Sequence, residues 1–127
     1  MATRVATILG IGFLLVGVLG FAMPGLLGAH LTLAHNIVHL VTGAVSLWLG
    51  LKGSVSAAKT FCIVFGAVYL LLGIAGFAAG DGADRMLELL PGQLMFGTMD
   101  HIIHVLLGGI YLIGGLATRT VGAVRTA

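Results

Sequence analysis

The sequence predicts an all-α membrane protein, a bundle of four transmembrane helices. Of the 127 residues, 59% are hydrophobic and only 8% are charged, whereas a soluble domain carries about 25% charged residues. Four apolar stretches reach the roughly 20 residues that a helix needs to cross the hydrocarbon core of a bilayer. Because lipid offers the backbone no hydrogen bonds, we expect each stretch to be helical.

The four expected spans form a single membrane domain over residues 1–127. They cover residues 5–23, 31–51, 60–79 and 95–117. Turn-forming residues separate them: Met23-Pro24-Gly25, Lys52-Gly53-Ser54 and Gly80-Asp81-Gly82. In the longest connection, residues 86–90 (MLELL) stand directly before Pro91, and we expect a short amphipathic helix there that lies on the membrane surface or caps the bundle.

The charged residues predict how the chain crosses the membrane. Basic residues flank one set of span ends: Arg4, Lys52, Lys59, Arg119 and Arg125. The loop after the third span carries Asp81, Asp84, Arg85 and Glu88. Basic residues are retained on the cytoplasmic side, so both termini are predicted to be cytoplasmic. We expect a multi-pass protein of a bacterial inner (plasma) membrane.

Two halves of the chain resemble each other, over residues 5–51 and 60–117. The first and third spans align at one constant offset, which pairs Gly10, Gly17, Gly20 and Phe21 with Gly66, Gly73, Gly76 and Phe77. The second and fourth spans align at another, which pairs His39, Gly43, Leu47 and Gly50 with His104, Gly108, Leu112 and Gly115. The pattern predicts a duplicated helical hairpin. Two spans per unit leave both copies pointing the same way, so the repeat is expected to be of the parallel kind.

Glycines recur at two-turn spacing along each span. The pairs are Gly10 and Gly17, Gly43 and Gly50, Gly66 and Gly73, and Gly108 and Gly115. Helices embedded in lipid have little hydrophobic drive to associate, and small residues that allow close backbone approach promote their packing. We therefore expect these glycines to line helix contacts.

The stretches FGAVYLLLGIAGF (65–77) and HNIVHLVTGAVSL (35–47) carry a resemblance to a known family. They resemble the bacterial four-span membrane family known as domain of unknown function 4383, over about residues 5–117. The chain differs in the fourth span, where His101 stands at the position that Asn36 occupies in the second. The resemblance implies a fold and a membrane location, and no activity.

Polar side chains gather where the second and fourth spans begin. His39 and His104 are expected about 10 Å below the outer boundary, given a rise of about 1.5 Å per residue. The neighbouring polar residues, about one turn shallower, are His35, Asn36, Asp100 and His101. An ionisable group inside a membrane is a functional candidate by default, and these residues are the candidate site.

Several functions remain open for these residues. The first is a non-catalytic structural or accessory subunit, in which His39 and His104 bond to Asn36 and Asp100 while glycine-lined faces dock onto other membrane subunits or a second copy. The leading alternative is a haem- or chlorophyll-type cofactor held by His39 and His104, with the other polar residues orienting these ligands.

Two further hypotheses use the same region. Thioether and imidazole ligands suit Cu(I), which makes Met95, Met99 and His101 a candidate copper site. A relay of the histidines and Asp100 would serve proton or solute transport, but all of these groups lie in the outer half. The sequence offers no basic patch with interleaved aromatics for nucleic acid and no convincing catalytic serine, so neither nucleic-acid binding nor enzymatic activity is expected. His30 is expected to be solvated or interfacial.

Overall fold

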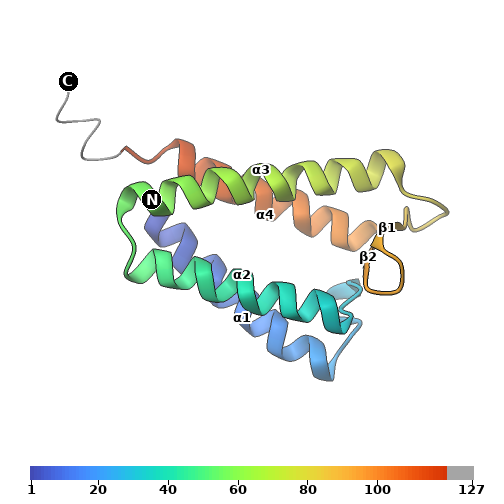
Figure 1. Ribbon diagram of the computed structural model, residues 1–127. Coiled ribbons are helices and arrows are strands. Elements are labelled where there is room, and N and C mark those ends of the chain that lie inside the picture. Colours follow the sequence, from blue (N-terminus) through green and yellow to red (C-terminus); the bar gives the residue numbers. More distant parts are fainter. Residues whose placement is uncertain (120–127) are drawn as a thin grey trace.

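The computed structural model describes residues 1–119 and consists of four long helices (Figure 1). They are α1 (Ala2–Ala22), α2 (Leu33–Leu51), α3 (Val55–Ala79) and α4 (Thr98–Leu116). Each is long and apolar enough to cross a membrane, so the predicted helical membrane class is confirmed. Arg125, one of the basic residues used to predict orientation, lies outside the described residues.

The helix ends differ from the predicted spans by a few residues, for local reasons. The helix α3 begins at Val55 rather than near residue 60, because the Ser54 hydroxyl accepts a hydrogen bond from the amide of Ala57 (3.0 Å) and caps the helix. The helix α1 ends just before the sequence Met23-Pro24, since a residue that precedes proline is disfavoured in the helical conformation. A single 3₁₀ turn, η1 (Leu26–Gly28), follows it.

The helices pack in two antiparallel pairs, α1 with α2 and α3 with α4, and the pairs contact each other much less closely (Figure 1). Glycines make both close contacts possible. A Cβ added to Gly10 would lie 2.6 Å from the backbone nitrogen of Leu47, and one added to Gly66 would lie 2.7 Å from that of Leu112. Both distances are below van der Waals contact. Glycine is therefore required at these crossings, as the spacing predicted.

Aromatic side chains fill the space between the two pairs. Phe13 of α1 stacks on Tyr69 of α3, with 5.6 Å between ring centroids, and Tyr69 stacks on Tyr111 of α4 at 6.4 Å. The Tyr111 hydroxyl is 3.0 Å from the hydroxyl of Ser46, which is itself fully buried. Cys62 is also fully buried, as its apolar surroundings predict.

The predicted outer helix at residues 86–90 is wrong: the segment forms a β-hairpin. Strand β1 (Leu87–Leu90) pairs antiparallel with β2 (Leu94–Phe96), with Leu87 opposite Phe96. Pro91 and Gly92 make the turn, and Gly92 has φ +74°, a left-handed conformation that glycine adopts freely. The fourth span consequently starts at Thr98 rather than at residue 95.

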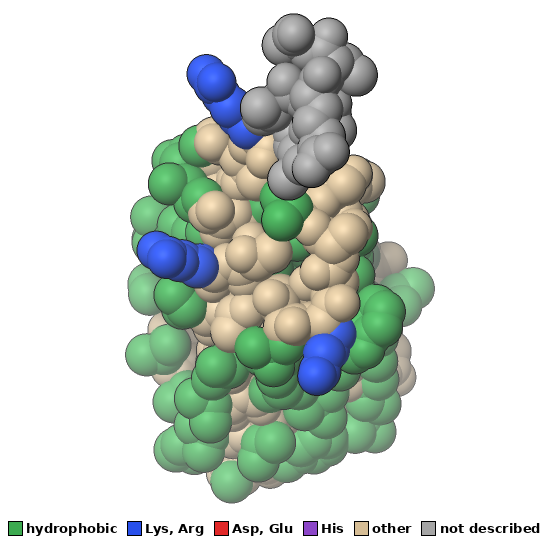
Figure 2. Space-filling model, turned by 90° about the vertical axis from the view of Figure 1, so that its left-hand side faces the viewer, with side chains coloured by type: hydrophobic (Ala, Val, Ile, Leu, Met, Phe, Trp, Pro, Cys, Tyr) green, Lys and Arg blue, Asp and Glu red, His purple; other side chains and the backbone are tan. Residues whose placement is uncertain are grey.

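The two ends of the bundle differ in charge. At the end that holds the N-terminus, Arg4, Lys52 and Arg119 are exposed, and Figure 2 shows Lys and Arg but no Asp, Glu or His among the side chains coloured by type. We call this the basic end and the opposite one, which carries β1 and β2, the hairpin end. Large apolar side chains cover the outward faces between the two ends, as in Leu15, Leu71 and Leu106.

Candidate functional site

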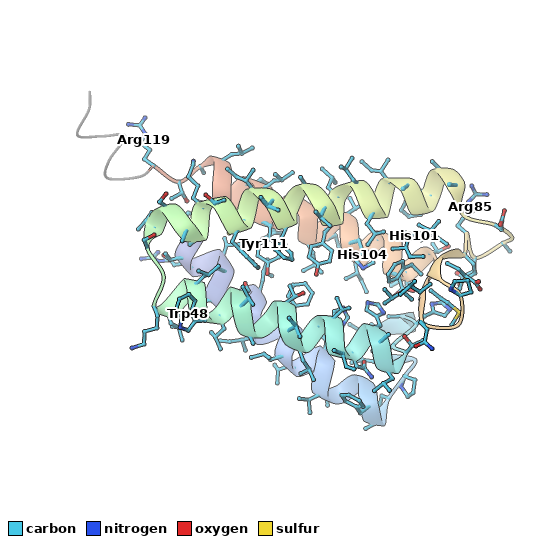
Figure 3. The ribbon with its side chains drawn as sticks, viewed as in Figure 1. Trp48, Arg85, His101, His104, Tyr111 and Arg119 are labelled. Atoms are coloured by element: carbon cyan, nitrogen blue, oxygen red, sulfur yellow. The ribbon has the colours of Figure 1, made fainter. Side chains whose placement is uncertain are left out.

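Three of the predicted histidines meet at the hairpin end, in the space between the helix pairs. The ring of His35 lies 4.2 Å from that of His39 and 6.3 Å from that of His104, measured between centroids. All three side chains are buried. Figure 3 shows His104 pointing from α4 into this space. The fold therefore joins residues of α2 and α4 that belong to different pairs.

Aromatic rings enclose the three imidazoles. Phe96, at the end of β2, makes edge contacts with His104 (4.9 Å) and His35 (5.1 Å). Phe13 of α1 lies 5.4 Å from His39, and Tyr69 of α3 stacks at 5.6 Å on His104. The β-hairpin thus covers the histidines with an aromatic side chain that is itself almost fully buried.

Local capping fixes the position of His35. Thr32 precedes α2, and its hydroxyl accepts a hydrogen bond from the amide of His35 (3.3 Å). The same hydroxyl donates to the carbonyl of Gln93, in the turn of the β-hairpin. His35 Nδ1 lies 2.8 Å from the carbonyl of His30, and because a carbonyl only accepts, this ring nitrogen carries the proton.

His39 and His104 are bonded differently from the prediction. Their Nδ1 atoms are buried and have no hydrogen-bond partner within residues 1–119. The expected bonds to Asn36 and Asp100 are therefore wrong for these nitrogens. A buried polar atom without a partner costs on the order of 1–3 kcal/mol, so each imidazole leaves an unused hydrogen-bonding capacity inside the bundle.

Asn36 and His101 lie away from the three histidines, inside the two helix pairs. Asn36 packs against Gly20 of α1, and His101 packs against Gly76 of α3. His101 Nε2 lies 2.6 Å from the carbonyl of Arg85; Figure 3 labels both residues at the hairpin end. Neither residue is placed to orient a ligand bound by His39 or His104, as the sequence had suggested.

Asp100 and His30 form a contact that the sequence analysis missed. The Asp100 carboxylate, only 2% exposed, lies 2.7 Å from His30 Nδ1 and accepts hydrogen bonds from the amides of His30 (3.2 Å) and Gly97 (2.8 Å). His30 also lies 3.8 Å from Asp84. His30 is therefore bonded within the protein rather than simply solvated. The pair ties the first loop to the start of α4.

A cavity of about 180 Å³ adjoins the histidines. His35, His39, His104 and Asp100 supply its polar lining. The remaining lining is apolar and comes from α1, α4 and the first loop: Leu9, Gly12, Phe13, Val16, Leu26, Leu27, Ala29, Leu31, Ile103 and Leu107. Because the polar groups gather at one side of an apolar space, the cavity suits a small molecule that has an apolar body and one polar group.

The geometry bears on two of the predicted ligands. Pockets for drug-sized ligands span about 300–1,000 Å³, so a tetrapyrrole does not fit a cavity of about 180 Å³. For the predicted copper ligands, His101 bonds through Nε2 to the carbonyl of Arg85 while Met99 packs against Gly28 of the first loop, so the two side chains contact different parts of the protein. Within residues 1–119, no three His, Cys, Asp or Glu side chains are grouped to hold a metal ion.

Three contributors to the site carried weak sequence signals. Phe13 and Phe96 are single aromatic residues in apolar surroundings, and nothing in their spacing distinguishes them from lipid-facing residues. His30 had one usable signal: it is a third histidine directly before the second span. Its partner Asp100 is 70 positions away, and only the fold brings the two together.

Comparison with known proteins identifies a family and adds no activity. No curated protein and no solved structure matches the chain. The family model described as a domain of unknown function (DUF4383) matches residues 3–117, which is nearly all of the four-helix region. The chain belongs to the family defined by domain of unknown function 4383.

Proposed function

We propose that this protein is a non-catalytic membrane protein that binds a small, mostly apolar molecule with a hydrogen-bonding group in the cavity beside His35, His39 and His104. One observation carries the proposal. The rings of His35, His39 and His104 and the carboxylate of Asp100 line a cavity whose remaining lining is apolar.

Two contributions to the binding free energy favour a ligand that has both a hydrogen-bonding group and apolar surface. A neutral imidazole has one donor and one acceptor nitrogen, so a hydroxyl or carbonyl group placed beside a ring nitrogen that reaches the cavity gains a hydrogen bond. The apolar lining contributes about 25 cal/mol for each Å² of ligand surface removed from water. A purely apolar molecule would gain only the second contribution.

The position of the cavity favours entry from the bilayer. Its lining includes Gly12 and Val16 on α1 and Ile103 and Leu107 on α4, and all four are partly exposed. The first loop contributes Leu26, Leu27, Ala29 and Leu31 on the side toward the hairpin end. A route between α1 and α4 at membrane depth suits a molecule dissolved in lipid.

Two small probes test this function directly. Phenol and toluene have similar ring volumes, and only phenol carries a hydroxyl. In the full chain reconstituted in lipid nanodiscs, we expect phenol to shift the imidazole NMR signals of His39 and His104 saturably, and toluene to bind more weakly. If neither probe gives a saturable shift, or if toluene binds as tightly as phenol, the proposal fails.

A matched pair of variants locates the binding. Gly12 lines the cavity and Gly109 does not, and a Cβ added to either residue meets no atom within 4 Å. We expect Gly12→Leu to block phenol binding by filling the cavity mouth, and Gly109→Leu to leave it unchanged. Equal binding by the two variants would place phenol somewhere other than the cavity.

We also propose that the two helix pairs are copies of one hairpin, with both termini in the cytoplasm and the hairpin end outside a plasma membrane. Equivalent contacts in the two pairs support the duplication: Gly10 meets Leu47 as Gly66 meets Leu112, and Gly20 meets Asn36 as Gly76 meets His101. The basic residues near the N-terminal end support the orientation.

A role as an accessory subunit of a larger complex stays a prediction, with one part corrected. The glycine-lined faces expected to dock onto other subunits are occupied within this chain. Each of the eight glycines abuts the partner helix of its own pair: Gly10, Gly17, Gly43, Gly50, Gly66, Gly73, Gly108 and Gly115. Any partner subunit, or a second copy, would have to use other surfaces.

A further inference from the structure

We infer that the first loop (residues 23–32) is a lid over the cavity, and that His30 is a latch that fastens this lid more firmly when its imidazole is protonated. The inference rests on the proposed function and deepens it, because it describes how access to the same cavity is regulated. Three features of the molecule support it: the path of the loop, a strained turn within it, and the charged groups around His30.

The first loop closes the cavity on the side toward the hairpin end. It leaves the end of α1 and reaches the start of α4, where Gly28 packs against Met99. It supplies Leu26, Leu27 and Leu31 to the cavity lining. The loop therefore forms one rim of the route between α1 and α4, and its displacement would widen the opening of the cavity.

The backbone of the lid is strained at Leu27. This residue has φ +57°, and Gly28 after it has φ +76°. The Cβ of leucine disfavours a left-handed conformation, which glycine adopts freely. Leu27 is also 65% exposed, so its side chain does little to hold the turn in place. Because a strained conformation persists only where its surroundings impose it, the closed lid depends on its attachments.

The polar attachments of the lid to the cavity wall converge on His30. Its amide and its Nδ1 atom both bond to the carboxylate of Asp100, at 3.2 and 2.7 Å. Its carbonyl accepts a hydrogen bond from Nδ1 of His35 (2.8 Å). Both Asp100 and His35 line the cavity. His30 thus joins the lid to one residue of α4 and one residue of α2.

Two carboxylates face the ring of His30, one at each nitrogen. Asp100 lies at Nδ1, and Asp84, in the connection between α3 and β1, lies 3.8 Å from Nε2. The titratable neighbour on α2 is His35. Arg85 is directed away, because its guanidinium donates to backbone carbonyls of α3. The ring therefore stands between two negative charges.

Protonation of His30 strengthens the latch. A neutral ring donates one hydrogen bond, to Asp100, and turns a lone pair toward Asp84. A protonated ring donates from both nitrogens, and hydrogen bonds between charged partners are the stronger ones. The side chain is 32% exposed, so water can deliver the proton, and imidazole ordinarily changes its charge between about pH 5 and 8. The lid is thus held more firmly at acid pH and released as the pH rises.

Amide hydrogen exchange in the full chain in nanodiscs, without any ligand, tests the latch. After correction for intrinsic exchange, we expect the amides of residues 28–31 to be about 3- to 10-fold more protected at about pH 5.5 than at about pH 7.5. His30→Asn keeps an amide donor for Asp100 and cannot be protonated, so this difference should disappear. Equal protection of the unaltered chain at the two pH values would overturn the inference.

Two exposed carboxylates at the hairpin end provide a matched control. Asp84→Asn removes the charge that faces His30 Nε2, so the pH difference in protection should shrink. Glu88→Gln removes a charge on β1 and should leave the difference unchanged. Equal effects of the two substitutions would indicate a general response to charge and would contradict a latch at His30.

Release of phenol connects the latch to the cavity. We expect phenol to dissociate about 3- to 10-fold more slowly at about pH 5.5 than at about pH 7.5 from the unaltered chain, and equally fast at both from His30→Asn. A pH difference in amide protection without one in phenol release would overturn the role of the loop as a lid. If phenol does not bind at all, the proposed function fails, and amide protection still decides whether His30 fastens the loop.

Discussion

Individual polar residues in this protein are mostly bonded by nearby groups, with four buried exceptions among residues 1–119. Ser46 donates to the carbonyl of Ala6 at 2.7 Å and pairs with Tyr111. Asp100 is held by His30 and Gly97. By contrast, four buried atoms have no partner among residues 1–119: Asn36 Oδ1 and the Nδ1 atoms of His39, His101 and His104. Asn36 and His101 lie inside the helix pairs and do not line the cavity, so an unpartnered atom does not by itself mark a binding position.

Asp100→Asn should destabilise the fold. The substitution removes a buried charge that accepts from the amide of Gly97 at the start of α4 and pairs with His30. We expect a loss on the order of 1–3 kcal/mol and a lower Tm in detergent. Asp84→Asn is the matched control, because Asp84 also faces His30 but its side chain is 55% exposed. Equal losses in the two variants would contradict the structural role of Asp100.

At the scale of elements, glycine decides how closely paired helices approach. The carbonyl of Gly10 lies within 2.9 Å of where a Cβ on Gly43 would stand, and the carbonyl of Gly66 within 2.8 Å of one on Gly108. Such contacts allow backbones to meet without large side chains between them. The aromatic layer between the pairs is a different kind of contact, made by rings rather than by backbones.

Adjacent glycines on α4 allow a controlled test of this packing. A Cβ at Gly108 would overlap the backbone of Leu70, whereas a Cβ at Gly109 meets nothing within 4 Å. Gly108→Ala should therefore separate α3 from α4 and lower the Tm. Gly109→Ala should be neutral or stabilise the helix by up to about 1 kcal/mol, because alanine favours helix more than glycine. The opposite ranking in a thermal unfolding assay would refute the predicted contact.

At the scale of the whole molecule, charge separates the two ends. The basic end exposes Arg4, Lys52 and Arg119 (Figure 2), and the hairpin end carries Asp84, Glu88 and the buried Asp100. Because basic residues are retained in the cytoplasm, this distribution predicts that the cavity lies in the outer half of the membrane.

Cysteine labelling tests this orientation. The native Cys62 is fully buried, so it should react little with a membrane-impermeant maleimide and serves as the background. Lys52→Cys and Glu88→Cys introduce thiols at exposed positions on the basic end and the hairpin end. In intact cells we expect Glu88→Cys to be labelled from outside and Lys52→Cys only after lysis. The reverse pattern would invert the predicted topology.

The sequence by itself determined the properties that depend on composition and local spacing. Four long apolar stretches must be helices in a solvent without hydrogen bonds, and the structure has them. Glycines two turns apart lie on one face of a helix, so their use in packing followed from position alone. The burial of His39 and His104 followed in the same way, because lipid solvates imidazole poorly.

Only the tertiary structure decided which residues meet. The approach of α2 to α4 set His35 and His39 beside His104, and chain folding joined His30 to Asp100, 70 positions apart. The β-hairpin in place of an expected helix depends on pairing between Leu87 and Phe96, which local propensity does not encode. Contacts between distant segments create the cavity, because its shape depends on how two helix pairs and a loop fit together.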